Sequence, residues 1–218
     1  MIKTLGIITA RGGSKSIPRK NIANLLGIPV LAYTIKSAQS SILDECILST
    51  EDQEIAEIGI KYGAKIPFMR PAELSKDDTK HLPVLQYTTE RFEQISHQKF
   101  DYILVLQPTS PLRIADDIDT AIKMADEFLP DSVVSLEKFT DLSIDKLKYL
   151  NEDKTVEPAF IDEKNSEGLP RQQRRPLFRR NGAIYLIKRE ILFSGSIYGQ
   201  NILRSEERRV GKECRSRW

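Results

Sequence analysis

The sequence predicts a three-layer α/β domain built on a mostly parallel sheet. Short apolar runs alternate with longer segments of helical periodicity, which is the pattern of repeated β-α units. The run Tyr102–Leu106 is apolar at every position, as expected for a parallel strand covered on both faces. The chain has 218 residues, of which 40% are hydrophobic, so it is long enough to bury one sizeable core.

Each predicted strand is a short run rich in apolar residues and bounded by polar or turn-forming residues. The first lies close to the start of the chain, and the last returns to the sheet after a long irregular segment. The predicted strands are Thr4–Thr9, Glu45–Ser49, a short one at Lys65–Phe68, Tyr102–Leu106, Ser132–Leu136 and Ala183–Ile187.

The segments between these strands carry apolar residues at helical spacing. In the first of them, Leu31, Ile35 and Ala38 share one face after Pro29. Gly63 closes the second, because glycine readily adopts the left-handed conformation that ends helices. The predicted helices are Val30–Ser40, Asp52–Gly63, Leu82–Ile95 and Asp116–Leu129, the last capped by Asp116 or Asp117.

The alternation of strand and helix breaks over residues 137–178, which are charged, rich in turn formers and without a clean period. An irregular stretch of this length in a compact domain indicates a segment that leaves the domain and has a function of its own. We therefore predict one domain over residues 1–203 with residues 137–178 as an arm. Residues 204–218 show no apolar periodicity and match a sequencing read-through artefact, so we set them aside as a non-native tail.

Charge and composition argue against several classes of protein. The chain has 33 Lys and Arg against 31 Asp and Glu, but residues 204–218 hold six of the former and three of the latter. The remainder is thus slightly acidic and gives no support to nucleic-acid binding. No segment is apolar for long enough to span a bilayer, no signal peptide is recognisable, and Cys46 lies in an apolar run as a buried thiol would. We expect a cytoplasmic protein with no membrane partner.

The most informative stretch is a glycine-rich, cationic loop, Thr9–Asn21, with the sequence TARGGSKSIPRKN. It follows the first strand, and its glycines and four cations suit the binding of a nucleotide triphosphate. It is not a P-loop, because Thr9 and Ser14 stand where that motif requires glycine. The glycine fingerprint of dinucleotide-binding proteins is also missing.

Five further motifs accompany this loop. They are Ser49-Thr50-Glu51-Asp52, Arg70-Pro71-Ala72-Glu73-Leu74, Leu106-Gln107-Pro108-Thr109-Ser110-Pro111-Leu112-Arg113, Arg171-Gln172-Gln173 and Arg179-Arg180-Asn181-Gly182-Ala183-Ile184-Tyr185. In this order, with the loop, the chain resembles the cytidylyltransferases that activate nonulosonic acids, which are the CMP-N-acetylneuraminic acid synthetases and their legionaminic and pseudaminic acid relatives. The resemblance implies a Rossmann-like fold of the nucleotide-diphospho-sugar transferase type.

The resemblance also implies transfer of CMP from CTP to the anomeric hydroxyl of a nonulosonic acid, with release of pyrophosphate. Arg11, Lys15 and Lys20 then neutralise the phosphates and carry catalysis. The implied nucleotide-binding residues are Ala10, Arg11, Ser14, Lys15, Asn21 and Arg70, the last contacting cytosine. The residues alone leave other interpretations open: Lys20 and Asn21 could mark a turn, and Arg70 could be a surface arginine before a proline.

For the acceptor sugar, the resemblance implies contacts from the end of the central strand, from the arm and from the last strand. Gln107 is polar directly after an apolar strand, at the edge of the sheet where ligands bind. Arginine suits the carboxylate of a nonulosonic acid. The implied residues are Gln107, Thr109, Ser110, Lys146, Arg171, Asn181 and Tyr185, with Lys146 and Arg171 acting across a homodimer.

The resemblance implies Mg²⁺, which family members bind through an Asp-x-Asp pair near the carboxyl terminus. That pair is missing before Leu203, and Asp116, Asp117 and Asp119 are better interpreted as helix-terminal or surface residues. His81 and His97 have no cysteine partners at metal spacing, so zinc is not expected. We therefore expect no metal ligands in this chain, a truncated carboxyl terminus and possible inactivity.

Three alternatives stay open at this point. The chain could bind nucleotide or sugar without catalysis, it could act on another acidic sugar such as 3-deoxy-octulosonate, or it could bind nucleic acid. Catalytic turnover would distinguish an enzyme from a protein that only binds nucleotide or sugar. The choice of acceptor tests the alternative of another acidic sugar. A steep salt dependence of binding would support nucleic-acid binding. The sequence does not choose among neuraminic, legionaminic and pseudaminic acids.

Overall fold

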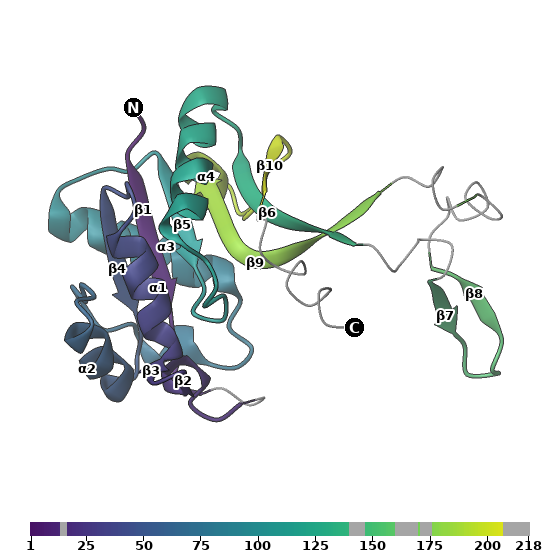
Figure 1. Cartoon of the computed structure of the whole chain (residues 1–218), viewed down its shortest axis with the longest axis horizontal. Coiled ribbons are helices and arrows are strands. Elements are labelled where there is room, and N and C mark those ends of the chain that lie inside the picture. The colour runs from purple at the N-terminus through teal and green to yellow at the C-terminus, as the bar shows by residue number, and fades with distance from the viewer. Residues whose placement is uncertain (14–16, 140–146, 160–169, 171–175, 207–218) are drawn as a thin grey trace. The chain divides into compact units, whose positions relative to one another are not determined.

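The structure, a computed structural model, describes the chain except for residues 14–16, 140–146, 160–169, 171–175 and 207–218 (Figure 1). It divides into two compact units. The first comprises Met1–Ser135 and Asn181–Trp218, and the second comprises Leu136–Arg180. Among the described residues, no helix combines the length and the apolar character that crossing a membrane requires.

The first unit is built on a six-stranded, mostly parallel sheet with the strand order β10-β6-β9-β5-β1-β4. Strand β1 lies between β4 and β5 and is parallel to both, with Ile7 opposite Ile47 and Val105. Strand β9 is antiparallel to β5. The strands are β1 (Thr4–Thr9), β4 (Glu45–Ser49), β5 (Tyr102–Leu106), β6 (Ser132–Phe139), β9 (Leu177–Lys188) and β10 (Ile202–Glu206), and a two-stranded ribbon joins β2 (Asn24–Leu25) to β3 (Ile28–Pro29).

Successive side chains of a strand point to opposite faces of the sheet, so both faces carry apolar side chains. Helices cover both of these faces. Ile8 and Leu104 belong to a buried cluster with residues of α1 and α4, whereas Ile7 and Val105 belong to a second cluster with residues of α3 and α5. The three-layer α/β fold is thereby confirmed (Figure 1). The helices are α1 (Val30–Gln39), α2 (Gln53–Lys61), α3 (His81–Ser96), α4 (Ala115–Phe128) and α5 (Arg189–Phe193), with single 3₁₀ turns η1 (Lys20–Ile22) and η2 (Ala72–Ser75).

The predicted strand at Lys65–Phe68 is wrong. Only Lys65 makes a bridge, to Ile47 of β4, where its carbonyl oxygen accepts a bond of 2.8 Å from the Leu48 amide. Pro67 has no amide hydrogen to continue such a ladder. The chain instead leaves the sheet and carries Arg70 to the edge where β1 ends.

The carboxyl-terminal part of the described chain is more regular than predicted. Strand β9 begins at Leu177, six residues before the predicted Ala183, and α5 and β10 follow it. Strand β10 runs through Glu206, so the boundary placed at residue 203 falls inside a strand, and Ser205 is buried.

The second unit, Leu136–Arg180, nearly coincides with the predicted irregular arm. Its described residues include a hairpin of β7 (Lys148–Leu150) and β8 (Val156–Pro158), with Tyr149 opposite Glu157. In the turn between them, the Asp153 carboxylate accepts bonds from the amide and hydroxyl of Thr155, 2.9 and 2.6 Å long. These bonds fix the turn locally.

Candidate active site

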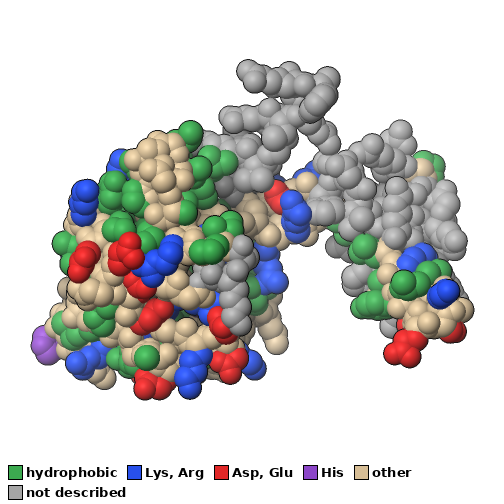
Figure 2. Space-filling view, turned by 90° about the horizontal axis from the view of Figure 1, so that it is seen from below, with side chains coloured by type: hydrophobic (Ala, Val, Ile, Leu, Met, Phe, Trp, Pro, Cys, Tyr) green, Lys and Arg blue, Asp and Glu red, His purple; other side chains and the backbone are tan. Residues whose placement is uncertain are grey.

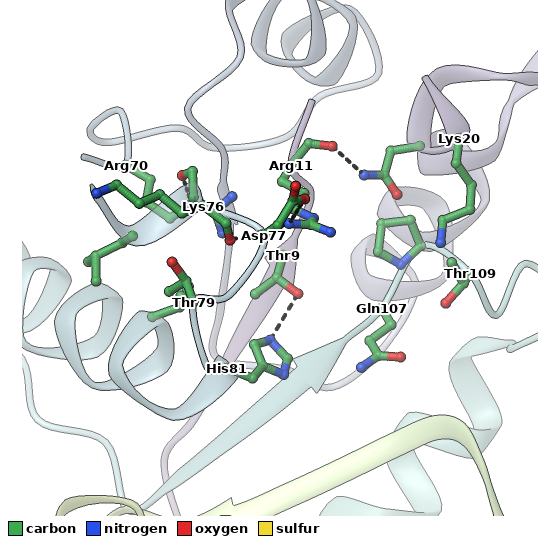
Figure 3. A pocket seen from close by; sticks show the side chains of 15 residues that line it. Thr9, Arg11, Lys20, Arg70, Lys76, Asp77, Thr79, His81, Gln107 and Thr109 are labelled. Atoms are coloured by element: carbon green, nitrogen blue, oxygen red, sulfur yellow. Dashed lines mark hydrogen bonds and ion pairs between the residues drawn. The ribbon is translucent and has the colours of Figure 1, made fainter. Parts of the chain in front are cut away.

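A cavity of about 530 Å³ lies where β1 and β5 end (Figure 3). Thr9 is the last residue of β1 and Gln107 directly follows β5, and both line the cavity. In open α/β sheets this carboxyl edge is where ligands bind. Most of the charged residues in its lining are cationic: Arg11, Lys20, Arg70 and Lys76. This charge suits a ligand that carries several phosphates.

The cationic loop contributes Arg11, Lys20 and Asn21 to the cavity. The Arg11 guanidinium lies 3.0 Å from the Asp77 carboxylate and 3.3 Å from the Lys76 carbonyl oxygen. The Asn21 side-chain amide donates a 2.9 Å bond to the Arg11 carbonyl oxygen, so it holds the loop in place (Figure 3). The ion pair with Asp77 thus engages Arg11 within the lining of the cavity.

Not every cation of the loop faces the cavity. Arg19 adopts a left-handed backbone conformation with φ of 54° and pairs with Asp52 at 2.5 Å and with Glu54. Asp52 also caps α2 by accepting a 3.0 Å bond from the Ile55 amide. The hydrogen bond from Arg19, assisted by the Ile55 amide, lowers the pKa of Asp52 despite its partial burial. Arg19 therefore ties the loop to α2.

Gly12 is packed against this capped helix end. A Cβ atom at Gly12 would lie 2.2 Å from the Asp52 carboxylate oxygen, whereas one at Gly13 would meet no atom of the described residues within 4 Å. The Gly12 amide donates a 2.8 Å bond to Glu51. The close approach therefore fixes glycine at position 12 and leaves position 13 free.

This difference predicts contrasting effects of two similar substitutions. Gly12→Ala is expected to displace the loop from Asp52 and Glu51. It should weaken binding of CTP, the nucleotide that the sequence resemblance implies, by about tenfold or more, the equivalent of one lost hydrogen bond to a charged group. Gly13→Ala is the matched control and should bind CTP within about twofold of wild type, since an open surface position changes little. Calorimetric titration with CTP measures both, and equal losses would contradict this account of the loop.

Arg70 is a buried cation at one end of the cavity. Its guanidinium lies 2.5 Å from Glu51 and 2.9 Å from the Ser75 hydroxyl, and its backbone amide donates to the Thr50 carbonyl oxygen at 2.8 Å. Glu51 thus links Arg70 to the Gly12 amide through its two oxygens. The interpretation of Arg70 as an ordinary surface arginine is wrong.

His81 also lines the cavity, although none of the sequence motifs indicates it. It is the first residue of α3, and its Nε2 lies 3.2 Å from the Thr9 hydroxyl (Figure 3). Burial, with a smaller contribution from the charge of Arg70, lowers the pKa of His81. The lowered pKa favours the neutral ring, which offers one donor and one acceptor. Asp77, Lys76 and Thr79 are further lining residues that the motifs did not indicate.

A second, smaller cavity of about 80 Å³ shares His81 and Gln107 with the first. Tyr185 also lines it. Next to it, Gly182 has φ of +86°, and a Cβ atom there would lie 3.6 Å from Gln107 Oε1, 3.8 Å from Ser110 Oγ and 3.9 Å from Tyr185 Oη. Three of the residues implied for the acceptor sugar therefore converge on one point, and Thr109 lines the larger cavity.

Arg113 fixes the backbone around this point. Its guanidinium is buried and donates to the carbonyl oxygens of Ala183 at 2.8 Å and Gln107 at 3.3 Å, and to the Thr34 hydroxyl at 2.9 Å. It thus joins the end of β5 to β9. Arg113 is the last residue of the motif that begins at Leu106, but the sequence alone did not predict that it would hold the backbone of β5 and β9 together.

Other implied residues are placed differently. Asn181 Oδ1 accepts bonds from Ser135 at 2.5 Å and from the Ala183 amide at 3.1 Å, and so braces the sheet. Ala10 is buried, and its amide donates to the Ser49 carbonyl oxygen at 3.1 Å. The predictions for Ser14, Lys15, Lys146 and Arg171 fall outside the described residues.

The described residues do not fit a magnesium site by themselves. Among them, no three His, Cys, Asp or Glu side chains gather where they could hold a metal ion. Within the described lining of the larger cavity, Asp77 is the carboxylate present, and it is paired with Arg11.

The fold and the cavity place the chain among α/β enzymes that bind a nucleotide at the carboxyl edge of the sheet without a P-loop. Within that class, the chain belongs to the cytidylyltransferase family, whose sequence profile matches residues 5–202. This confirms the family expected from the motifs and the assignment as a nucleotidyltransferase.

Individual relatives agree with this assignment. A pseudaminic acid cytidylyltransferase of Campylobacter jejuni subsp. jejuni serotype O:2 is 40% identical over 167 residues, 75% of this chain and 69% of the relative. A CMP-N,N'-diacetyllegionaminic acid synthase of Legionella pneumophila subsp. pneumophila is 31% identical over 205 residues, 91% of this chain and 84% of the relative.

A solved structure supports the fold. The CMP:2-keto-3-deoxy-manno-octonic acid synthetase complexed with CTP matches with a TM-score of 0.66 at 18% identity, over 94% of this chain and 90% of the other. At that identity, the likeness shows the shared α/β fold alone.

Proposed function

We propose that the chain transfers CMP from CTP to the anomeric hydroxyl of a nonulosonic acid and releases pyrophosphate. The observation that carries the proposal is the pair of adjoining cavities, a large cationic one and a small one, which share His81 and Gln107. The relatives named for pseudaminic and legionaminic acids support the acceptor class.

In the proposed reaction, the anomeric oxygen attacks the α-phosphorus of CTP. A bond forms between that oxygen and phosphorus, the bond to the bridging oxygen breaks, pyrophosphate leaves with its electron pair, and the hydroxyl proton passes to solvent. Such transfer depends on alignment and charge neutralisation rather than on a covalent enzyme intermediate. Arg11 and Lys20 supply cations to the phosphates, and Arg70 supplies a fixed donor group at its end of the cavity.

Mg²⁺ would enter with CTP, and it would neutralise charge on the phosphoryl groups. The chain works as a homodimer in which the unit Leu136–Arg180 mediates assembly and brings Lys146 and Arg171 to the acceptor. It acts in the cytoplasm, where CTP is available, without nucleic acid or membrane as a partner. On the face of the first unit that Figure 2 shows, acidic and basic side chains are interspersed, which supports a small-molecule substrate over nucleic acid.

The test is pyrophosphate release from CTP and Mg²⁺ with pseudaminic, legionaminic, N-acetylneuraminic and 3-deoxy-octulosonic acids as separate acceptors. We expect turnover with at least one nonulosonic acid, and none when UTP or ATP replaces CTP. Turnover with 3-deoxy-octulosonic acid alone would overturn the proposed acceptor class. If folded protein binds CTP but shows no turnover with any acceptor, the chain is a nucleotide-binding protein and not an enzyme. Sedimentation as a monomer at micromolar concentration would contradict the proposed dimer.

A further inference from the structure

His81 lies where the two cavities meet. Of the described residues, His81 and Gln107 are the ones that line both cavities. A glutamine amide neither takes up nor releases a proton near neutral pH, whereas an imidazole does both. Within the described linings, His81 is therefore the titratable group that borders both cavities.

One nitrogen of the His81 ring is held by the protein and the other is open. Nε2 lies 3.2 Å from the hydroxyl of Thr9, at the end of β1 (Figure 3). Among the residues that the structure describes, none forms a hydrogen bond with Nδ1. Nδ1 is also not one of the partnerless polar atoms that the protein encloses, so it opens onto the cavities. When Nε2 carries the hydrogen and donates it to Thr9, Nδ1 presents a lone pair.

The other ionisable groups in the described linings do not supply a base. The lysines and arginines already hold their protons, and so do the phenols of the tyrosines at neutral pH. Asp77 is paired with Arg11 at 3.0 Å. Besides His81, the ionisable residues are Arg11, Lys20, Arg70, Lys76 and Asp77 in the larger cavity and Tyr185 and Tyr198 in the smaller one.

The surroundings of His81 keep its ring unprotonated before a ligand binds. Burial lowers the pKa of His81, and the charge of Arg70 lowers it further. The first turn of α3, which the structure describes in full, contains no acidic residue, and the positive end of the helix acts in the same direction. The phosphates of bound CTP would raise this pKa again, because they add negative charge. The ring would thus be free to accept a proton and more basic once the nucleotide is bound.

We infer that His81 is a catalytic residue whose Nδ1 takes the proton from the anomeric hydroxyl of the acceptor. The inference rests on the proposed function, which puts the CTP phosphates in the cationic cavity and the acceptor where Gln107, Ser110 and Tyr185 converge. The anomeric oxygen then reacts at the junction that His81 borders. As this oxygen bonds to the α-phosphorus, its hydrogen passes to the Nδ1 lone pair, and pyrophosphate leaves with the electron pair of the broken bond. The imidazolium afterwards releases the proton to solvent, which restores the neutral ring.

His81→Gln tests this role, because glutamine keeps a side-chain amide that can donate to Thr9 but provides no base. With the acceptor that wild type uses, kcat is expected to fall by about 10²- to 10⁴-fold, the usual contribution of general acid–base catalysis. Affinity for CTP, measured by calorimetry, should change far less than kcat. In wild type, kcat should decline on the acid side with the uptake of one proton, and the variant should lose this decline. A kcat within about threefold of wild type, or an acid decline that persists in the variant, would overturn the inference.

His97→Gln is the matched control, because it makes the same substitution at the other of the two histidines in the chain. His97 is exposed at the carboxyl end of α3 and belongs to neither described lining. This variant should keep the kcat and the pH profile of wild type. It also assigns the imidazole signals in a nuclear magnetic resonance spectrum, since one histidine signal then remains.

The tautomer of His81 gives a readout that needs no turnover. In ¹⁵N spectra at pH 7 we expect a neutral ring with the hydrogen on Nε2, and Thr9→Val should shift the ring toward the other tautomer. A wild-type ring with its hydrogen on Nδ1 would overturn the inference, because that nitrogen then has no lone pair. If wild type turns over and His81→Gln does so equally well, the inference alone falls. If wild type turns over with none of the acids, the proposed function fails and the inference falls with it.

Discussion

Arg70→Gln is expected to raise the dissociation constant for CTP by about 10- to 100-fold. The guanidinium is buried in the cavity lining and held in one orientation by Glu51 and Ser75. Glutamine removes the charge and the fork of donors, and a hydrogen bond to a charged group is worth about 1.5–3 kcal/mol, which corresponds to this loss of affinity. Arg70→Lys should recover only part of it, because an ammonium group cannot make both bonds in the same plane.

Two mechanisms could produce this loss of affinity, and a variant of Glu51 distinguishes them. Arg70 could act on the nucleotide directly, or it could act through Glu51, whose other oxygen holds the Gly12 amide of the cationic loop at 2.8 Å. Glu51→Gln keeps a similar shape and removes the charge opposite Arg70. If Arg70 acts directly, this variant binds CTP at least as tightly as wild type, since the guanidinium is then less neutralised. If the loop is the route, Glu51→Gln weakens binding.

Calorimetric titration of CTP measures all of these variants under one set of conditions. Arg91→Gln is the matched control, because Arg91 is an exposed residue of α3 whose guanidinium lies 3.4 Å from Gln94, outside the cavity lining. It should leave CTP binding unchanged. An affinity of Arg70→Gln within twofold of wild type would remove Arg70 from the nucleotide site.

The sheet and the cationic loop could be predicted from sequence because both are local features. Strands β1, β4 and β5 begin and end at the predicted residues, and the apolar runs of the central strands β1 and β5 are buried on both faces of the sheet. Arg11 and Gln107 reach the same cavity because each follows a strand that ends at the same edge of the sheet. Parallel topology alone brings them together.

What the sequence did not reveal depends on contacts between distant segments. Nothing local marks His81 as a cavity residue, because its position follows from the Thr9 hydroxyl, which is 72 residues away. The pairing of Arg19 with Asp52, which turns one loop cation away from the cavity, likewise requires the helix cap of α2. The short strand at Lys65–Phe68 was predicted from its apolar residues, but Pro67 prevented the ladder that those residues alone would favour.

The second large effect is expected away from the site, at Glu93. This carboxylate is buried and accepts bonds from Arg189 at 2.8 and 2.9 Å, from Lys99 at 2.8 Å and from the Phe100 amide at 3.3 Å. It joins α3 to α5 and to the start of β5. Glu93→Gln leaves the guanidinium without its charged partner, and breaking a buried pair in this way costs about 3–5 kcal/mol of unfolding free energy. Arg189 is partly exposed, which favours the lower value.

The loss of unfolding free energy in Glu93→Gln is expected to depend on pH. Burial raises the pKa of Glu93, but the bonds from Arg189, Lys99 and Phe100 outweigh it and hold the pKa below its usual value. A carboxylate with a lowered pKa stabilises the folded state above its unfolded pKa of about 4.3, and this contribution is lost as the pH falls through the folded pKa. The difference in stability between wild type and Glu93→Gln should therefore be constant from pH 6 to 8 and shrink below about pH 4.

Hydrogen exchange of the β5 amides under urea measures this difference in the first unit alone, because central strands exchange by unfolding of the whole sheet. Glu90→Gln, an exposed residue of the same helix, is the matched control and should change stability by less than about 0.5 kcal/mol. Both variants should bind CTP as wild type does while they remain folded, since neither residue lines the cavity. A loss of CTP affinity in folded Glu93→Gln would show that α3 transmits the packing at Glu93 to His81 at its other end. Stability and binding would then be coupled through this helix.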